Sequence, residues 1–372
     1  LLGDQYKEKV RSVLMAEDGY LLVDADIKGA ELFVAAVLSG DPNMYDHVIR
    51  SNLAEKGYDA AGNKVAGGKF PHPNFYDIHS NVAKLAFRLE CDPTKRGLEY
   101  CYATVAPADG VVDKVVRTTD GWLIKMVGGA VLPTVRGEKP FVSEGSVVKQ
   151  GEILAGGRAK FRILAKAVIF GLMYGRGAKA IAVQARMEGV PGITVQVAEE
   201  IIQAVYTMYP CLEPFFAECR RRVVDPGFLV NPFGGMRRFP AGKADRTQLA
   251  DFERQAMNWP MQSTVAEVID RAIARLYRTI RDQGLEDVIR LVLQVHDSIV
   301  LETRYDYVKY VRDELIPYAM KQSVPIYPTD LGGNPLGTGP FYMETDTKVG
   351  FRWSESLSEK EIDELAATEL AR

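Results

Sequence analysis

The sequence predicts an α+β fold, with helices and strands in separate parts of the chain and a small all-β module near the middle. Three observations lead to this prediction. Short apolar runs typical of buried strands lie at 20–26 and 289–301. Segments with helical periodicity occupy much of the chain between them. Residues 102–157, the β module, are instead rich in Val, Thr and Gly, with turn signals between short strands.

The individual elements are expected as follows. Strands are expected at 20–26, at 111–116, at 122–127 and, on either side of a turn at His296-Asp297, within 289–301. Helices are expected at 31–38, 77–89, 161–174, 197–209, 212–223 and 248–276. Glycines and prolines predict a loop over 53–75, and Gly234-Gly235 predicts a hairpin over 227–240. The sequence Ser358-Glu-Lys-Glu361 predicts a capping box at the start of a C-terminal amphipathic helix.

The composition is that of a globular protein. The 372 residues are 26% charged and 47% hydrophobic, with a net charge of −3, which excludes disordered, collagen-like and coiled-coil chains and suggests about two or three domains. No run of about 18 apolar residues predicts a membrane span, and residues 1–11 lack the apolar core of a signal peptide. Four cysteines without a CxxC pair indicate a reduced, cytoplasmic compartment. The chain does not begin with Met, so we expect it to be part of a longer one.

Two acids, Asp26 and Asp297, lie at the ends of apolar strands. A carboxylate in an apolar strand costs several kcal/mol unless a cation compensates it, and two carboxylates brought together repel each other. A divalent metal removes both penalties, and Mg²⁺ prefers carboxylate and phosphate oxygens. The pair therefore suggests a Mg²⁺ site, although either residue alone can equally be an Asp in a turn at a strand end.

Arg162, Lys166, Phe170 and Tyr174 recur every four residues in the helix predicted at 161–174. This spacing places them on nearly one face, drifting by about 40° per step. Two cations followed by two aromatic rings suit a nucleoside triphosphate, and between 158 and 187 seven Lys and Arg occur with no Asp or Glu. The alternative is a solvated cationic stripe next to core aromatics.

Arg254, Asn258 and Gln262 share the same spacing in the helix predicted at 248–276. A row of guanidinium and amide donors can bind the acceptors that every base pair presents in the minor groove. An ordinary polar helix face explains the pattern equally well.

Four segments together resemble DNA polymerase family A, the DNA polymerase I family. Asp24-Ala-Asp26-Ile-Lys-Gly-Ala-Glu31-Leu resembles its motif A. Arg162-Ile-Leu-Ala-Lys166-Ala-Val-Ile-Phe170-Gly-Leu-Met-Tyr174-Gly175 resembles motif B. Leu293-Gln-Val-His296-Asp297 resembles motif C, and Glu253-Arg254-Gln-Ala-Met-Asn258-Trp-Pro-Met-Gln262 resembles the helix that follows the fingers. Their order and spacing match the family over most of the chain outside the β module.

The resemblance implies DNA-directed DNA synthesis by transfer of a nucleotide from a dNTP to a primer 3′-hydroxyl. Asp26 and Asp297, completed by the backbone carbonyl of Ile27, would hold two Mg²⁺ ions, for which Mn²⁺ can substitute. Lys166 would act in catalysis at the triphosphate. The nucleotide would be bound by Glu31, His79, Arg162, Lys166, Phe170 and Tyr174, with Glu31 excluding the ribose 2′-hydroxyl. Primer–template DNA would be bound by Gly175, Arg254, Asn258, Gln262 and His296.

Three positions depart from the family pattern. Lys28 and Gly29 replace the usual Ser and Gln of motif A, and the third departure leaves alternatives open. Ser298 follows Asp297 where these polymerases usually carry Glu. A His-Asp-Ser sequence occurs in the related single-subunit RNA polymerases, so an RNA polymerase is one alternative. Glu31 at the ribose gate and the DNA-polymerase form of motif B argue against it. A catalytically inactive, polymerase-like DNA-binding subunit is the other alternative, which the presence of both metal acids and both phosphate cations opposes.

The resemblance also implies a domain organisation. The palm would comprise 1–44 and 241–372, the latter with the C-terminal tail, and the fingers would comprise 45–240 with the β module inserted. The family's thumb and exonuclease are not expected within this chain, so an upstream segment or a second chain would carry the thumb. Each half of the β module resembles a barrel-sandwich hybrid, the fold of biotinyl and lipoyl carriers. Because Lys125-Met126 departs from the carrier-lysine pattern, a structural or docking module is expected rather than a carrier.

Overall fold

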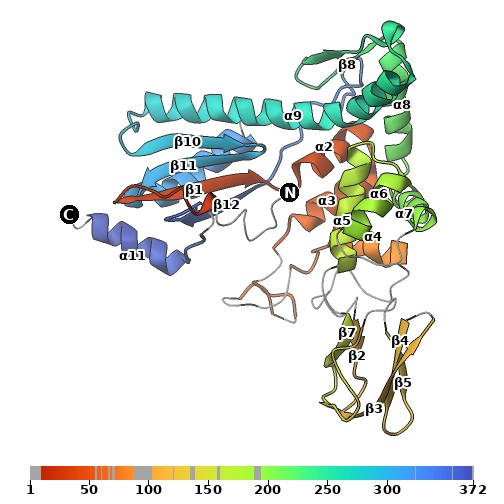
Figure 1. The fold of residues 1–372 in the computed structure, drawn as a ribbon. Coiled ribbons are helices and arrows are strands. Elements are labelled where there is room, and N and C mark those ends of the chain that lie inside the picture. Colours follow the sequence, from red (N-terminus) through yellow and green to blue (C-terminus); the bar gives the residue numbers. More distant parts are fainter. Residues whose placement is uncertain are drawn as a thin grey trace. The chain divides into compact units, whose positions relative to one another are not determined.

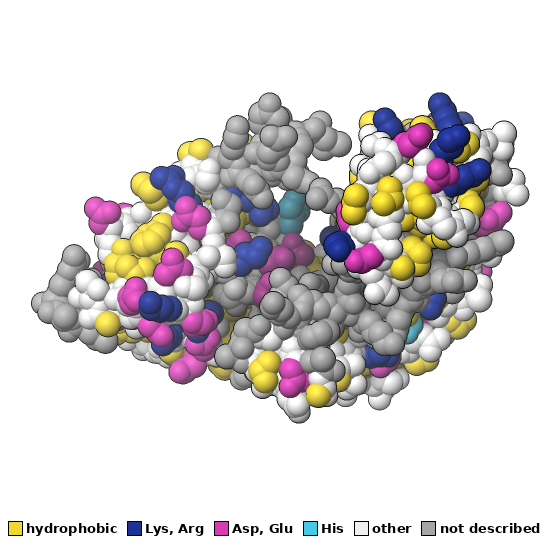
Figure 2. Space-filling view, turned by 90° about the horizontal axis from the view of Figure 1, so that it is seen from below, with side chains coloured by type: hydrophobic (Ala, Val, Ile, Leu, Met, Phe, Trp, Pro, Cys, Tyr) yellow, Lys and Arg dark blue, Asp and Glu magenta, His cyan; other side chains and the backbone are white. Residues whose placement is uncertain are grey.

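The computed structural model describes residues 10–54, 57–59, 61–65, 68, 72–87, 103–119, 121–134, 139–156, 160–187, 194–322, 324–353 and 355–370. The chain forms two compact units. The sheet unit comprises Leu1–Asp41 and Pro214–Arg372, and the helical unit comprises Pro42–Glu213. Acidic and basic side chains are interspersed over the face drawn in Figure 2, consistent with the small net charge.

A four-stranded antiparallel sheet is the centre of the sheet unit (Figure 1). Its strand order is β10 (Ile289–Val295), β11 (Ser298–Arg304), β1 (Tyr20–Ile27) and β12 (Thr345–Gly350). In β1, Leu21, Val23, Ala25 and Ile27 are fully buried. Because side chains alternate along a strand, the two aspartates of β1 share the other face.

Helices surround this sheet. The longest, α9 (Arg246–Asp282), begins at a capping box formed by Asp245 and Gln248. It packs against α2 (Ala30–Ser39), β11 and the hairpin strand β8 (Phe228–Val230), which pairs with β9 (Met236–Arg238). The remaining helical elements of the sheet unit are α8 (Leu212–Val224), whose first two residues belong to the helical unit, η3 (Ala241–Lys243), η4 (Tyr305–Tyr307), α10 (Val308–Tyr310), η5 (Val311–Leu315), η6 (Pro317–Gln322) and α11 (Glu359–Leu370). The expected hydrogen bonds of Ser358 and Glu361 cap α11.

The helical unit contains α3 (Pro42–Ser51), α4 (Ile78–Phe87), α5 (Lys160–Met173), α6 (Ala178–Met187) and α7 (Val195–Met208). α4 packs against α3, α5 and α7, and α6 packs against α5 and α7. Buried aliphatic side chains such as Val82, Val168, Ile169 and Ile201 form the core of this unit.

The β module, also in the helical unit, folds around a core of its own. Its strands are β2 (Ala103–Val105), β3 (Gly110–Thr118), β4 (Gly121–Met126), β5 (Val131–Pro133), β6 (Val147–Val148) and β7 (Ile153–Gly156). They form a sheet of order β5-β4-β3-β6 and a separate β2-β7 pair. The shared core consists of Ala106, Val112, Ile124, Met126, Val148, Leu154 and Ala155. The α+β fold with a small all-β insertion is therefore confirmed.

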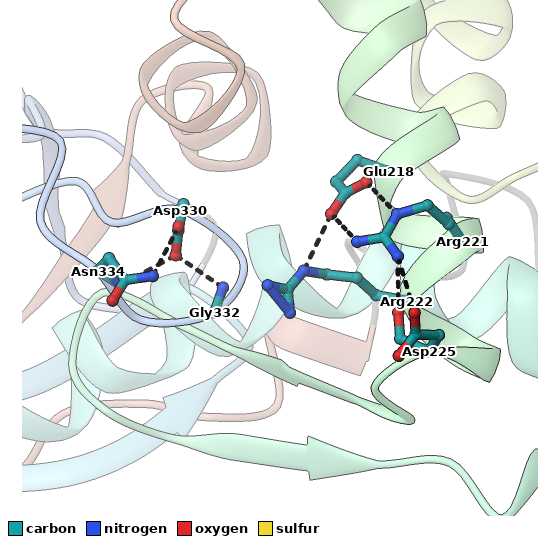
Figure 3. A network of polar contacts seen from close by, with 7 residues as sticks. All are labelled: Glu218, Arg221, Arg222, Asp225, Asp330, Gly332 and Asn334. Atoms are coloured by element: carbon teal, nitrogen blue, oxygen red, sulfur yellow. Dashed lines mark hydrogen bonds and ion pairs between the residues drawn. The ribbon is translucent and has the colours of Figure 1, made fainter.

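Residues 214–240 belong to the sheet unit, whereas the sequence predicts them within the fingers. On α8, Glu218 accepts hydrogen bonds from Arg221 and Arg222 (Figure 3). The same figure shows Asp330, which accepts from the backbone N–H of Gly332 at 2.8 Å. A Cβ on Gly332 would lie 2.7 Å from the Arg222 guanidinium, so this loop lies directly against the end of α8. The palm and fingers boundaries themselves stay predictions.

The predicted strands and helices that the structure describes are confirmed, with ends shifted by a few residues, except that α9 extends six residues beyond its expected end at 276. The elements α3, α6, β12 and the helical turns of 305–322 were not expected from the sequence. None of the described helices is long and apolar enough to cross a membrane.

Candidate active site

Acidic side chains gather on one face of the four-stranded sheet. Asp24 and Asp26 lie on β1, Asp297 lies in the turn between β10 and β11, and Asp346 lies on β12. In the strand register, Asp26 lies opposite Ser298 on one side and Asp346 on the other. The two predicted metal acids thus line one cavity, Asp26 on β1 and Asp297 in the turn that leads into the adjacent strand β11, although they are 271 positions apart in the sequence.

These acids line a cavity of about 240 Å³, which we call the carboxylate cavity. Its lining consists of Arg11, Asp24, Asp26, Val295, His296, Asp297, Ser298, Asp346, Lys348 and Trp353. At its rim, the backbone N–H of Ile27 donates to the carbonyl oxygen of Asp297 at 3.3 Å. This hydrogen bond joins the end of β1 to the turn that carries Asp297.

The cavity carries unbalanced negative charge. The pKa of Asp26 is raised to about 6, first by partial burial and then by the nearby carboxylates of Asp297, Asp24 and Asp346 in that order, while Lys348 lowers it. A carboxylate whose ionised form is destabilised in this way gains stability when a cation enters the site. The electrostatics of the cavity therefore favour a bound cation.

His296 fixes the shape of the β10–β11 turn. Val295 and Ser298 are paired, so the connection has only two residues. Among the described non-glycine residues, His296 alone has a positive φ, of 54°. Such a conformation costs a non-glycine residue on the order of 1–2 kcal/mol, and it places His296 in the lining of the cavity next to Asp297.

Asp24 is held by two hydrogen bonds. Ser298 Oγ donates to its Oδ1 at 2.6 Å, and the indole Nε1 of Trp353 donates to its Oδ2 at 2.9 Å. Asp24, Asp346, Lys348 and Trp353 were not among the site residues predicted from the sequence. Asp24 lies two residues from Asp26, and this spacing could have placed it on the same face of the strand. The positions of Asp346, Lys348 and Trp353 in the cavity depend on the pairing of β12, a strand that was not predicted.

The donor set of the cavity fits a divalent cation of the Mg²⁺ class. Within the described ranges, no three His, Cys, Asp or Glu side chains are arranged as a complete metal cage. Mg²⁺ usually takes only one or two protein carboxylates and completes its shell with water and substrate phosphates. Asp26 and Asp297 supply oxygen ligands of the required kind, and the unbalanced charge around Asp26 is relieved by a cation.

Comparison with known proteins identifies the family of this site. The sequence model of DNA polymerase family A matches residues 153–354, which include α5, α9 and the strands β10 to β12. The chain belongs to DNA polymerase family A. The DNA polymerase of Escherichia phage T5 is 24% identical over 355 residues, which cover 92% of this chain and 31% of the phage protein. The thermostable DNA polymerase I of Thermus filiformis is 28% identical over 350 residues, 94% of this chain and 29% of that protein.

The family resemblance extends to the fold. The POL domain of Pol1 from M. smegmatis, solved in complex with DNA primer-template and dNTP, superposes with a TM-score of 0.59 at 18% sequence identity. The superposition covers 95% of this chain and 43% of that structure. This family A chain thus shares the polymerase-domain fold, and it spans about a third of the length of the phage and Thermus relatives.

Four further residues predicted for this family A site lie on helices of the sheet unit. Glu31 is half-buried in the first turn of α2, whose N-cap residue Gly29 has the left-handed conformation. On α9, Arg254 and Gln262 are exposed and Asn258 is half-buried, so the row lies off the buried face of the helix. Arg254 forms an ion pair with Asp251.

The helical unit brings together three of the predicted nucleotide-binding residues. The rings of His79 on α4 and Phe170 on α5 have centroids 6.1 Å apart. Lys166 Nζ lies 5.7 Å from the centroid of Phe170, while the lysine side chain is exposed. Arg162 belongs to α5, but its side chain lies outside the described residues.

Tyr174 and Gly175 follow directly after α5. The exposed fraction of Tyr174 is 36%. Gly175 has a φ of 67°, the left-handed conformation that commonly ends a helix. The predicted residues therefore form two groups, one in each unit, and each group is assembled by the packing of its own unit.

Proposed function

We propose that this chain carries the nucleotidyl-transfer site of a template-directed DNA polymerase. The primer 3′-hydroxyl would attack the α-phosphate of a dNTP, and pyrophosphate would leave. The observation that carries this proposal is the pairing of Asp26 and Asp297 in one cavity of a family A polymerase fold. The primer–template DNA and dNTP named for the M. smegmatis structure are substrates of the same class.

Asp26, Asp297 and the backbone carbonyl of Ile27 would hold two Mg²⁺ ions, with Mn²⁺ as a substitute. When bound, such ions lower the pKa of the attacking hydroxyl and stabilise the charge that develops on the leaving group. Asp26 lies on β1 and Asp297 directly precedes β11, and backbone hydrogen bonds join β1 to β11 and Ile27 to Asp297, so the sheet restrains the separation of the two acids. A fixed separation of the metal ligands would hold the reacting groups in the geometry that in-line attack requires.

The helical unit would bind the triphosphate and the base. Lys166, Arg162 and His79 supply cationic and N–H groups for phosphate oxygens, with Lys166 acting in catalysis as charge develops. Phe170 would contact the sugar, and Tyr174 with Gly175 would contact the template base. On the sheet unit, Glu31 would exclude a ribose 2′-hydroxyl, because a carboxylate crowds that position and cannot donate a hydrogen bond to it.

Primer–template DNA would contact Arg254, Asn258 and Gln262 on α9 and His296 beside the cavity. Contact with DNA follows local side chains rather than the net charge of the chain. In this proposal the sheet unit contains the palm and the helical unit the fingers, and an upstream segment or a second chain supplies the thumb.

The proposal is tested by primer extension with the full-length protein that contains this chain. We expect Asp26→Asn and Asp297→Asn each to lower Mg²⁺-dependent incorporation by on the order of 1000-fold, since several kcal/mol of charge stabilisation would be lost. Asp282→Asn, which removes an exposed acid at the end of α9, is the matched control and should retain activity. Near-normal incorporation by either site variant would contradict the assignment.

The same assay separates the alternatives. With ribonucleotides and deoxynucleotides in competition, we expect a strong preference for deoxynucleotides, as Glu31 at the sugar implies. A preference for ribonucleotides would indicate an RNA polymerase instead. DNA binding without any incorporation by the wild-type protein would indicate an inactive polymerase-like subunit.

A further inference from the structure

Asp24 is a half-buried residue in the lining of the carboxylate cavity. The proposed mechanism gives it no role. It lies two residues before Asp26 on the same face of β1 and lines the same cavity. Both of its carboxylate oxygens accept a hydrogen bond, from Ser298 Oγ at 2.6 Å and from Trp353 Nε1 at 2.9 Å. Hydrogen bonds to an ionised acceptor are shorter and stronger than neutral ones, so the orientation of this carboxylate is fixed.

These two hydrogen bonds join three separate segments of the chain. Ser298 is 274 positions from Asp24 and directly follows Asp297, while Trp353 is 329 positions away, beyond β12. The sheet register pairs Ser298 with Asp26 rather than with Asp24, so the side-chain hydrogen bond runs diagonally across the strands. Asp24 therefore restrains the residue next to one proposed metal ligand while sharing a strand with the other.

The charges around Asp24 come from every neighbouring strand. Asp26 lies on its own strand, Asp297 in the β10–β11 turn, and Lys348 directly opposite it on β12. The Arg11 guanidinium also lines the cavity and lies 4.7 Å from the ring centroid of Trp353. Asp24 is thus one of four acids in a cavity with two cations, Arg11 and Lys348.

We propose that Asp24 is a positioning residue of the polymerase site, which anchors Ser298 and thereby the adjoining Asp297, and whose charge strengthens divalent-cation binding in the cavity. The inference rests on the proposed function. It also gives Ser298 a role. Ser298 occupies a position at which the family A pattern usually has Glu. In this chain, the Ser298 hydroxyl on β11 donates its hydrogen bond to the Asp24 carboxylate on β1.

The first test measures cation binding directly. Free Mn²⁺ is counted by electron paramagnetic resonance during titration of the full-length protein without DNA or dNTP. We expect Asp24→Asn to weaken Mn²⁺ binding by about 10-fold, the size of effect that groups supporting metal ligands commonly have. Asp287→Asn removes an exposed acid from the same unit and is the matched control. Unchanged Mn²⁺ binding in Asp24→Asn would overturn the proposal.

The second test exchanges the pair. Asp24→Ser and Ser298→Asp are made singly and together, so that the double variant restores a hydroxyl and a carboxylate on opposite strands. Asp24→Ser should weaken Mn²⁺ binding, because it removes a carboxylate from the cavity. Ser298→Asp should lower the rate of primer extension at saturating Mg²⁺, because two carboxylates then face each other and the anchoring hydrogen bond is lost. The double variant should recover most of both losses. A double variant that only sums the two single effects would overturn the anchoring role, because contacting residues should show coupling.

Two controls keep the outcomes distinct. Ser298→Ala removes the hydroxyl but no charge, so it should lower the rate at saturating Mg²⁺ more than it weakens Mn²⁺ binding. The reverse pattern would overturn the division of roles. Thermal unfolding of each variant identifies any that have lost their fold. If wild type and Asp26→Asn are equally inactive in extension, the proposed function fails, while the Mn²⁺ titrations still decide the inference about Asp24.

Discussion

At the scale of single residues, Asp26 couples the stability of the protein to pH. Its pKa is raised from 3.8 to about 6, first by burial and then by Asp297, Asp24 and Asp346. The folded state therefore binds more protons than the unfolded chain between about pH 4 and 6. By linkage, the free energy of unfolding falls as the pH rises through this window and stays lower above it.

The corresponding prediction concerns Asp26→Asn in metal-free buffer. Asparagine cannot ionise, so the variant should unfold at a higher temperature than wild type at pH 8 and at a similar temperature near pH 4. We expect a gain of roughly 2–4 °C, the shift that ~1 kcal/mol gives in a unit of this size after discounting for the partial exposure of the carboxylate. Thermal unfolding in EDTA at both pH values measures it. An equal gain at both would refute the electrostatic cause.

At the scale of single elements, α11 is attached to the preceding helical turns by a small set of contacts. Ile362 is buried, with an exposed fraction of 2%. Arg312 donates to Glu359 of α11 at 2.6 Å and, through two other nitrogens, to Asp313. A side-chain hydrogen bond and ion pairs of this sort contribute modestly at the surface, so Ile362 should carry most of the attachment.

We therefore predict that Ile362→Ala loosens α11. Removing a buried isoleucine to Ala typically costs about 2–5 kcal/mol. Brief proteolysis should cut the variant within α11 faster than wild type, with the rest of the sheet unit still protected. Lys360→Ala is the matched control, because that side chain is exposed and pairs with Glu364, one turn away on the same helix. Equal cleavage of Ile362→Ala and wild type would contradict this account.

The pattern of apolar residues in each strand and helix explains which elements could be predicted from the sequence. β1, β10, β11 and the long helix α9 were predictable because apolar residues recur with a clear period and bounded ends. β12 was not, since Asp346, Lys348 and three threonine or glycine neighbours give it little apolar character. The predicted site accordingly included Asp26 and Asp297, whose acids interrupt apolar runs. It omitted the contact between Asp24 and Trp353, which depends on tertiary structure across 329 positions.

At the scale of the whole molecule, the β module is an insertion with adjoining ends. Its first and last strands are paired, with Ala103 opposite Gly156. The core residues that the structure describes all belong to the module itself, and the helices α4 and α5, which flank it in sequence, pack on each other. Insertions with neighbouring ends and an independent core are the kind that chains tolerate losing.

We predict that replacing 103–156 by a short Gly-Ser linker leaves the rest of the protein folded. The helical circular dichroism signal and the unfolding midpoint of the remainder should change little. The same deletion in primer extension then measures what the module contributes to DNA synthesis. Loss of the helical signal would mean that the module is needed for the fold of the helical unit.

The position of β1 at the middle of the sheet has a consequence for synthesis of the protein on the ribosome. The partner of Asp24 on β11 is made 274 residues later, a delay of roughly 15–50 s at bacterial or eukaryotic elongation rates. The helical unit, Pro42–Glu213, is contiguous and can complete its core during that interval. Until β11 is made, β1 is an apolar nascent strand without its β11 partner. The carboxylate cavity therefore forms after the helical unit. A ribosome-bound chain that stops before Asp297 cannot form the carboxylate cavity.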